Sequence, residues 1–179
     1  MEWVLENADK YAFDTKHMYL VGDSAGANMA AAYSIMCTNS EYADKYDFKV
    51  PQKFVPSAVA LNCGIYGTRR AADENNMGFK KLMLDLLGKD GFDEKINLLN
   101  VPDFVTRNFP PVFIMTATGD FLVNEPPLMV EKFKEMNVTY EYKVYGDDKI
   151  KPTHVFHCNI KDENAKKCNY DECAFFGRL

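Results

Sequence analysis

Features that would assign the chain to several common classes are missing from its 179 residues. No apolar run reaches the roughly 20 residues of a membrane span, and the segment Met1–Lys10 lacks the basic-then-apolar pattern of a secretory signal. The net charge is −5 and the basic residues are scattered, so no basic stripe is available for a nucleic-acid backbone. We therefore expect no membrane span, no nucleic-acid partner and a cytoplasmic location.

A disulfide framework and a common zinc motif are also missing. The cysteines are Cys37, Cys63, Cys158, Cys168 and Cys173, an odd number that includes no Cys-x-x-Cys pair. Reduced, buried thiols are their expected state. The group formed by His154, His157, Cys158, Cys168 and Cys173 could in principle bind zinc, but its spacings match no common site. We therefore expect neither a metal nor another cofactor.

What the sequence does contain is an alternation of strand-like and helix-like stretches. Strands are expected at His17–Val21, Ser57–Cys63, Val112–Ala117 and Thr139–Tyr145. Helices are expected near the N-terminus, at Ala27–Cys37, at Phe79–Leu87, between the caps Asn124 and Asn137, and from Asp162 to about Phe176. Strands separated by helices pair in parallel through right-handed crossovers. The predicted fold class is α/β, with about four parallel strands and flanking helices in a single domain over residues 1–179.

One short motif carries chemistry, the segment Gly22-Asp23-Ser24-Ala25-Gly26 between a strand-like run and an Ala-rich helix. This is the context of a nucleophile elbow, in which the serine has a strained backbone. We expect that side chains at Gly22 and Gly26 would clash with the closely approaching backbone. The helix N-terminus would make the Ala25 N–H an oxyanion donor. Ser24 is the candidate nucleophile; the alternative is a tight turn that serves packing alone.

A nucleophilic serine needs a base, and the base needs a residue that orients it. On this kind of sheet the chain order is serine, acid, histidine. Asp120 follows the strand expected at Val112–Ala117, so it lies at the carboxyl end where ligand sites collect. His154 follows the last strand-like run. We therefore predict Asp120 and His154 as the partners of Ser24.

Other residues compete for these two roles. His157 lies three residues from His154, and His17 precedes the serine, against the expected order. Asp147 and Asp148 could replace Asp120 but belong to the same loop as His154. They remain the alternatives for base and orienting acid.

At these residues the chain resembles the hormone-sensitive-lipase-like and carboxylesterase branch of the α/β-hydrolases. The segments that carry the resemblance are Trp3–Tyr11, Gly22–Gly26, Phe109–Ile114, Thr118–Val123 and His154–Phe156. The resemblance implies hydrolysis of small-molecule carboxylic esters through an acyl-enzyme, with Ser24, Asp120 and His154 as the triad and no cofactor. It also implies that residues 64–108 contain an insertion that helps to cover the acyl pocket.

The resemblance extends only to the C-terminal part of that fold. Only 23 residues precede Ser24, and no His-Gly-Gly-Gly-type segment, the usual source of a second oxyanion donor, occurs in the chain. The loss of one donor costs about 10²–10³ in turnover, so we expect a weakened esterase. The first four strands of the family's sheet are also missing, which leaves the strand Met18–Val21 with an unpaired edge. We expect homodimerisation through this edge, or its covering by the N-terminal helix.

Two further functions compete with esterase activity. A catalytically inactive fragment that acts as a binding or dimerisation module would explain the missing oxyanion segment, but not the order of the triad residues. A peptidase or an acyltransferase could use the same residues on the same fold, because the fold alone does not fix the substrate.

Overall fold

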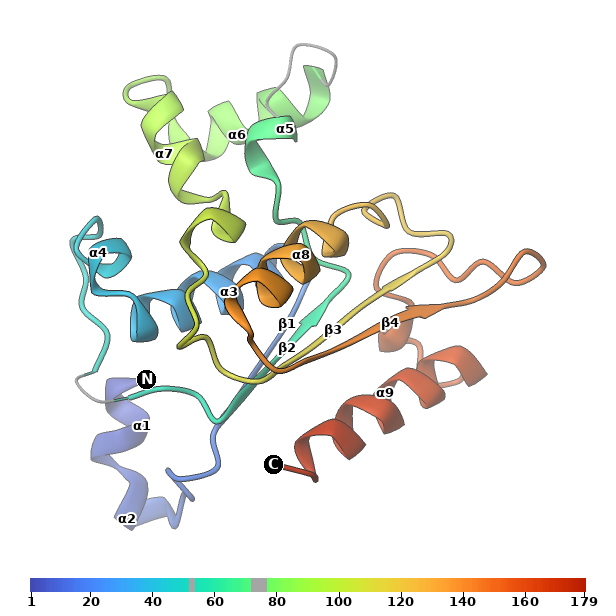
Figure 1. The fold of residues 1–179 in the computed structure, drawn as a ribbon, viewed down its shortest axis with the longest axis horizontal. Helices are drawn as coiled ribbons and strands as arrows, with labels where there is room; N and C mark the ends of the chain where they lie inside the picture. The colour runs from blue at the N-terminus through green and yellow to red at the C-terminus, as the bar shows by residue number, and fades with distance from the viewer. Residues whose placement is uncertain (52–53, 72–76) are drawn as a thin grey trace.

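A parallel sheet of four strands organises the chain, whose computed structural model describes residues 1–51, 54–71 and 77–179. The strands are β1 (Tyr19–Asp23), β2 (Ala58–Asn62), β3 (Val112–Ala117) and β4 (Tyr140–Tyr145). They lie in the order β1-β2-β3-β4, and every neighbouring pair is parallel (Figure 1). The predicted α/β class with about four parallel strands and flanking helices is confirmed.

Helices cover both faces of this sheet. The α-helices are α1 (Glu2–Glu6), α2 (Ala8–Tyr11), α3 (Ala25–Thr38), α4 (Ser40–Ala43), α5 (Thr68–Ala71), α6 (Met77–Leu87), α7 (Phe92–Leu98), α8 (Pro126–Met136) and α9 (Glu163–Phe176). The 3₁₀ helices in the described ranges are η1 (Val101–Phe104) and η2 (Phe156–Cys158). In Figure 1, α3 and α8 lie on one side of the sheet and α9 lies on the other.

Two apolar layers separate the helices from the sheet. Because side chains alternate along a strand, Val59 and Leu61 of β2 join the layer under α3 and α8, whereas Ala58 and Ala60 join the layer under α9. The strands β2 and β3 are buried at every position. Such continuous apolar strands are typical of a parallel sheet that is covered on both faces.

The beginning of the chain departs from the prediction. The first strand lies two residues later than expected, because its register with β2 begins at the pair Tyr19–Ala58. The N-terminal helix is divided into α1 and α2 at Asn7, and none of their residues is buried. The helix expected near the N-terminus is therefore present in two pieces, and it adds no buried residue to the core.

One helix was not predicted, and another was predicted with the wrong N-cap. Helix α4 lies where the sequence predicted no helix, and it begins where the Asn39 side chain accepts a hydrogen bond from the Tyr42 N–H at 3.2 Å. Helix α8 has Glu125 rather than Asn124 as its N-cap. Its predicted C-cap is confirmed, because Asn137 has the left-handed conformation with φ 56°.

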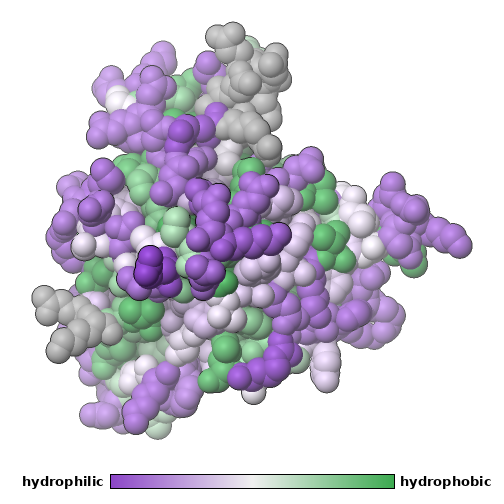
Figure 2. Space-filling view, viewed as in Figure 1, coloured by the Kyte–Doolittle hydropathy of each residue, from purple (hydrophilic) through white to green (hydrophobic). Residues whose placement is uncertain are grey.

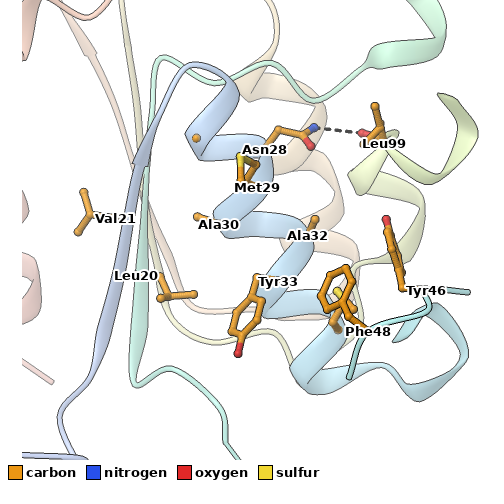
Figure 3. Close-up of a pocket in the computed structure, with 12 residues that line it drawn as sticks. Leu20, Val21, Asn28, Met29, Ala30, Ala32, Tyr33, Tyr46, Phe48 and Leu99 are labelled. Carbon is orange, nitrogen blue, oxygen red and sulfur yellow. Dashed lines mark hydrogen bonds between the residues drawn. The ribbon is translucent and has the colours of Figure 1, made fainter. Parts of the chain in front are cut away.

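The outer flank of β1 is open. Within the described part of the chain β1 pairs only with β2, and the side chain of Val21 is 56% exposed. Beside it lies a mainly apolar groove of about 480 Å³, lined largely by Leu20, Val21 and residues of α3 (Figure 3). On the face shown in Figure 2, hydrophobic residues form small patches between larger hydrophilic areas. Among the described residues, no helix is both long and apolar enough to cross a bilayer.

Candidate active site

The turn between β1 and α3 has the geometry of a strained elbow. Ser24 has φ 54° and ψ −120°, outside the usual range for a residue with a side chain. Its N–H donates a hydrogen bond to the Asn62 carbonyl oxygen of β2 at 2.9 Å. A Cβ atom at Gly22 would collide with the Gly26 carbonyl group, which explains the first glycine of the motif.

The prediction for the second glycine of the motif was wrong. A Cβ atom at Gly26 would have no neighbouring atom within 4 Å, because Gly26 lines the open groove beside β1. The turn is therefore tightly packed at Gly22 but not at Gly26.

Ala25 occupies the position expected of an oxyanion donor. It is exposed and is the first residue of α3. An N–H in the first turn of a helix has no carbonyl partner within that helix. The Ala25 N–H is thus free of intrahelical bonding and lies directly beside Ser24 in the chain.

The structure brings the three residues proposed from the sequence into one hydrogen-bonded row. The distance from His154 Nε2 to Ser24 Oγ is 2.9 Å, and the distance from His154 Nδ1 to Asp120 Oδ1 is also 2.9 Å. The side chain of His154 is 19% exposed and that of Asp120 is fully buried. The histidine therefore contacts solvent on one side while the acid is enclosed.

Two further residues, which the sequence did not identify, hold the Asp120 carboxyl group in place. The Leu122 N–H donates to Oδ1 at 2.8 Å, and the Thr116 hydroxyl donates to Oδ2 at 3.3 Å. Both lie within four residues of Asp120, so local sequence could have suggested them. The ring of Phe121 lies 4.5 Å from the His154 ring and is itself exposed, which places an apolar surface beside the imidazole.

Cys63 lies close to this row but is not a competing nucleophile. It is fully buried. Burial, and after it a hydrogen bond to Asp120, raise the pKa of its thiol far above the usual range. The reactive form of cysteine is the thiolate, so Cys63 is inert at neutral pH.

The alternative histidine His17 and the alternative acid Asp147 make hydrogen bonds away from Ser24. His17 is exposed and its Nδ1 lies 2.7 Å from Asp14 Oδ2, and the Asp147 carboxylate accepts hydrogen bonds from the Lys149 and Ile150 N–H groups. Asp148 is exposed in the same loop.

His157, the other candidate for the base, contacts a thiol rather than Ser24. Its Nε2 lies 3.8 Å from Cys158 Sγ. Burial lowers the pKa of His157, Asp23 partly offsets this effect, and His154 adds to it.

The residues considered for zinc do not come together as one group. In the described part of the chain, potential ligand atoms lie within 4.8 Å of one another in two sets. These sets are Asp23 with His157 and Cys158, and Cys63 with Asp120 and His154. Cys168 and Cys173 belong to neither set.

The segment 64–108 is tied to α3 and α8 at both ends. Asn28, four residues after Ser24, donates hydrogen bonds to the Ile65 carbonyl at 2.9 Å and the Leu99 carbonyl at 3.0 Å. Glu125 accepts from the Tyr66 and Gly67 N–H groups at 3.0 and 2.7 Å. These buried polar contacts fix the segment next to the elbow, and nothing in the local sequence indicated them.

A family model described as the alpha/beta hydrolase fold matches residues 1–157. No curated protein sequence matches the chain. Among solved structures, the chain is similar to esterase B from Lactobacillus Rhamnosis (HN001), with a TM-score of 0.84 and 20% identity over 98% of this chain and 57% of that one. It is also similar to a fungal esterase from Rhizomucor miehei (TM-score 0.72, 17% identity, 99% of this chain and 56% of that one).

An esterase from Pyrobaculum calidifontis is similar to the same extent, with a TM-score of 0.71 and 19% identity over 98% of this chain and 56% of that one. The chain thus spans little more than half the length of these solved structures, and at such identities the similarity shows the fold alone. The family model, in contrast, covers most of the chain. The chain belongs to the α/β-hydrolase fold family.

Proposed function

We propose that the chain hydrolyses carboxylic esters through an acyl-enzyme, with Ser24 as the nucleophile, His154 as the base and Asp120 as the residue that orients the base. The observation that carries the proposal is the row of two 2.9 Å contacts from Ser24 Oγ through the imidazole to Asp120. It begins at a serine with φ 54°, the strained turn of a nucleophile elbow.

The chemistry follows from this geometry. As Ser24 Oγ attacks the ester carbonyl carbon, His154 Nε2 accepts its proton, and the imidazolium then donates that proton to the leaving alcohol. Water attacks the resulting acyl-serine with His154 again as base, which releases the carboxylic acid and restores the serine. The Asp120 carboxylate accepts a hydrogen bond from the Nδ1–H group throughout and stays ionised, which holds the tautomer in which Nε2 is free to act as base.

We assign the developing oxyanion to the Ala25 N–H at the start of α3. A second donor of the His-Gly-Gly-Gly type has no counterpart in this sequence. Since one lost donor costs about 10²–10³ in turnover, activity is proposed to be weak unless another donor group completes the site. The alternative is a catalytically inactive binding or dimerisation module, and the missing second oxyanion donor favours it.

We further propose that residues 64–108 help to cover the acyl pocket. Helices α5, α6 and α7 stand together apart from the sheet (Figure 1), and the contacts of Asn28 and Glu125 anchor them beside the elbow. Helix α6 exposes Leu82 and Leu86, which are 57% and 67% exposed. These are apolar side chains of the kind that line acyl sites.

Homodimerisation through the open edge of β1 is also proposed. An unpaired strand edge is a template for a second chain, and Val21 with the apolar groove beside it enlarges that surface. We expect light scattering during gel filtration to show a dimer for the parent chain and a monomer for Val21→Lys. A monomeric parent chain would contradict this proposal and leave the triad unaffected.

The function is tested by hydrolysis of p-nitrophenyl acetate and butyrate by the chain, by Ser24→Ala and by His154→Ala. We expect measurable turnover for the parent chain that both variants lose. Ser57→Ala, which removes an exposed hydroxyl that bonds only the Lys16 carbonyl among the described residues, is the matched control. Equal rates for the parent chain and Ser24→Ala would contradict the esterase proposal and favour the inactive module.

A further inference from the structure

A second cluster of reactive side chains lies beside the triad. It consists of Asp23, His157 and Cys158, each of which offers one ligand atom within 4.8 Å of the other two. Asp23 ends β1 and directly precedes Ser24, while His157 and Cys158 belong to η2. The cluster therefore joins the nucleophile strand to the helical turn that follows His154.

The spacing within the cluster is close to that of a metal site. The distance from Cys158 Sγ to His157 Nε2 is 3.8 Å. A zinc ion with bonds of about 2.3 Å to sulfur and 2.0–2.1 Å to nitrogen, at a tetrahedral angle, separates these two atoms by about 3.6 Å. A small rotation of either side chain would bring the two atoms to this separation.

The backbone of the cluster is fixed while its polar atoms remain available. Asn169 of α9 donates a hydrogen bond to the His157 carbonyl at 3.1 Å, and the Cys158 N–H donates to the Val155 carbonyl at 3.1 Å. Asp23 and Cys158 are both exposed, so their carboxylate and thiol can be reached from solvent. The ring nitrogen of His157 that faces the thiol is Nε2.

We propose that Asp23, His157 and Cys158 form a binding site for a divalent cation of the zinc class. A thiolate, an imidazole and a carboxylate are the ligands that zinc uses, and a site with three protein ligands leaves the fourth position to water. The thiol disfavours Mg²⁺ and Ca²⁺, which prefer oxygen ligands. This site is separate from ester hydrolysis and does not depend on it.

The test uses Co²⁺ as a spectroscopic probe with the whole, reduced chain. We expect one Co²⁺ per chain, a near-ultraviolet sulfur-to-cobalt charge-transfer band and tetrahedral visible bands. Stoichiometric Zn²⁺ should remove these signals, whereas excess Mg²⁺ should leave them. A titration that gives no charge-transfer band would overturn the proposal.

Variants locate the ion. Cys158→Ser should abolish the charge-transfer band, and Asp23→Asn and His157→Gln should each weaken binding by at least the 10–100-fold that loss of an outer-shell partner costs. The matched controls Cys173→Ser and His17→Gln, both at exposed positions, should bind like the parent chain. A charge-transfer band that survives in Cys158→Ser would show that another cysteine binds the ion and would refute the assignment. Circular dichroism of each variant separates lost ligands from lost folding.

Discussion

The two halves of the candidate site rest on very different parts of the sheet. Strand β3, which leads to Asp120, is buried at all six positions between β2 and β4. Strand β1, which leads to Ser24, has no fully buried residue and forms the sheet edge within the described chain. The acid is enclosed by the core, whereas the nucleophile is supported from one side.

This difference shows which forces hold each half. The position of Asp120 depends on core packing and on donors from Thr116 and Leu122. The position of Ser24 depends on close backbone approach at Gly22 and on the hydrogen bond to the Asn62 carbonyl. Truncation of core side chains around Asp120 should therefore lower the free energy of unfolding most. Substitutions that disturb the backbone should instead distort the turn at Ser24.

The largest expected effect is on catalysis, from Asp120→Asn. The amide keeps the shape of the buried side chain, but its NH₂ group, when it faces the ring, donates to Nδ1 and cannot accept a hydrogen bond from Nδ1–H, so His154 takes the wrong tautomer. We expect turnover of a p-nitrophenyl ester to fall by roughly 10⁴, or to the rate of Ser24→Ala if that is reached first.

Thr116→Val is the control for the acid. It removes one 3.3 Å donor to Asp120 Oδ2 and leaves the contact with His154. Its turnover should fall by no more than about 150-fold, because a hydrogen bond to a charged group is worth about 1.5–3 kcal/mol. A larger loss for Thr116→Val than for Asp120→Asn would contradict the proposed role of Asp120.

The contrast between core and edge predicts a difference in stability. Phe113 of β3 is fully buried, so Phe113→Ala should lower the free energy of unfolding by about 3–5 kcal/mol. Val21 is mostly exposed on β1, and Val21→Ala should change it by no more than about 0.5 kcal/mol. Urea unfolding followed by circular dichroism measures both, and similar losses would show that β1 is packed as tightly as β3.

The smallest effects separate the two glycines of the elbow. An added Cβ at Gly22 collides with the Gly26 carbonyl, so Gly22→Ala should cost about 1–3 kcal/mol, as overpacking does. Gly26 has open space and a helical position, so Gly26→Ala should stabilise the chain by about 0.5–1 kcal/mol. Thermal unfolding of the two variants under one condition compares them. Equal destabilisation would indicate that the outer flank of the elbow is occupied after all.

Much of the fold could be predicted from the sequence, because buried parallel strands are continuous apolar runs. The runs at Ser57–Cys63 and Val112–Ala117 contain β2 and β3. The start of β1 could not be found in this way, since pairing with β2 sets its register. Helix α4 was missed because a side-chain cap at Asn39, rather than an apolar face, starts it.

The candidate triad could be proposed from the sequence because a short motif and the order of residues along the chain point to it. Ser24 stands in a recognisable motif, and chain order selects Asp120 and His154, which the structure brings together across 130 residues. The open space at Gly26 was not predictable, because it depends on what packs against β1. The proximity of Asp23 to His157 and Cys158 could likewise not be predicted, since no spacing in the sequence links β1 to η2.

The most direct test of the triad is covalent labelling of Ser24 by a short-chain p-nitrophenyl phosphonate, followed by intact-mass measurement and peptide mapping. A phosphonate reacts rapidly with a serine that a neighbouring base activates and slowly with unactivated hydroxyls, so the test does not require complete turnover. We predict one adduct per chain, located on Ser24 and absent from His154→Ala. An unlabelled chain, or a label on another residue, would contradict the account.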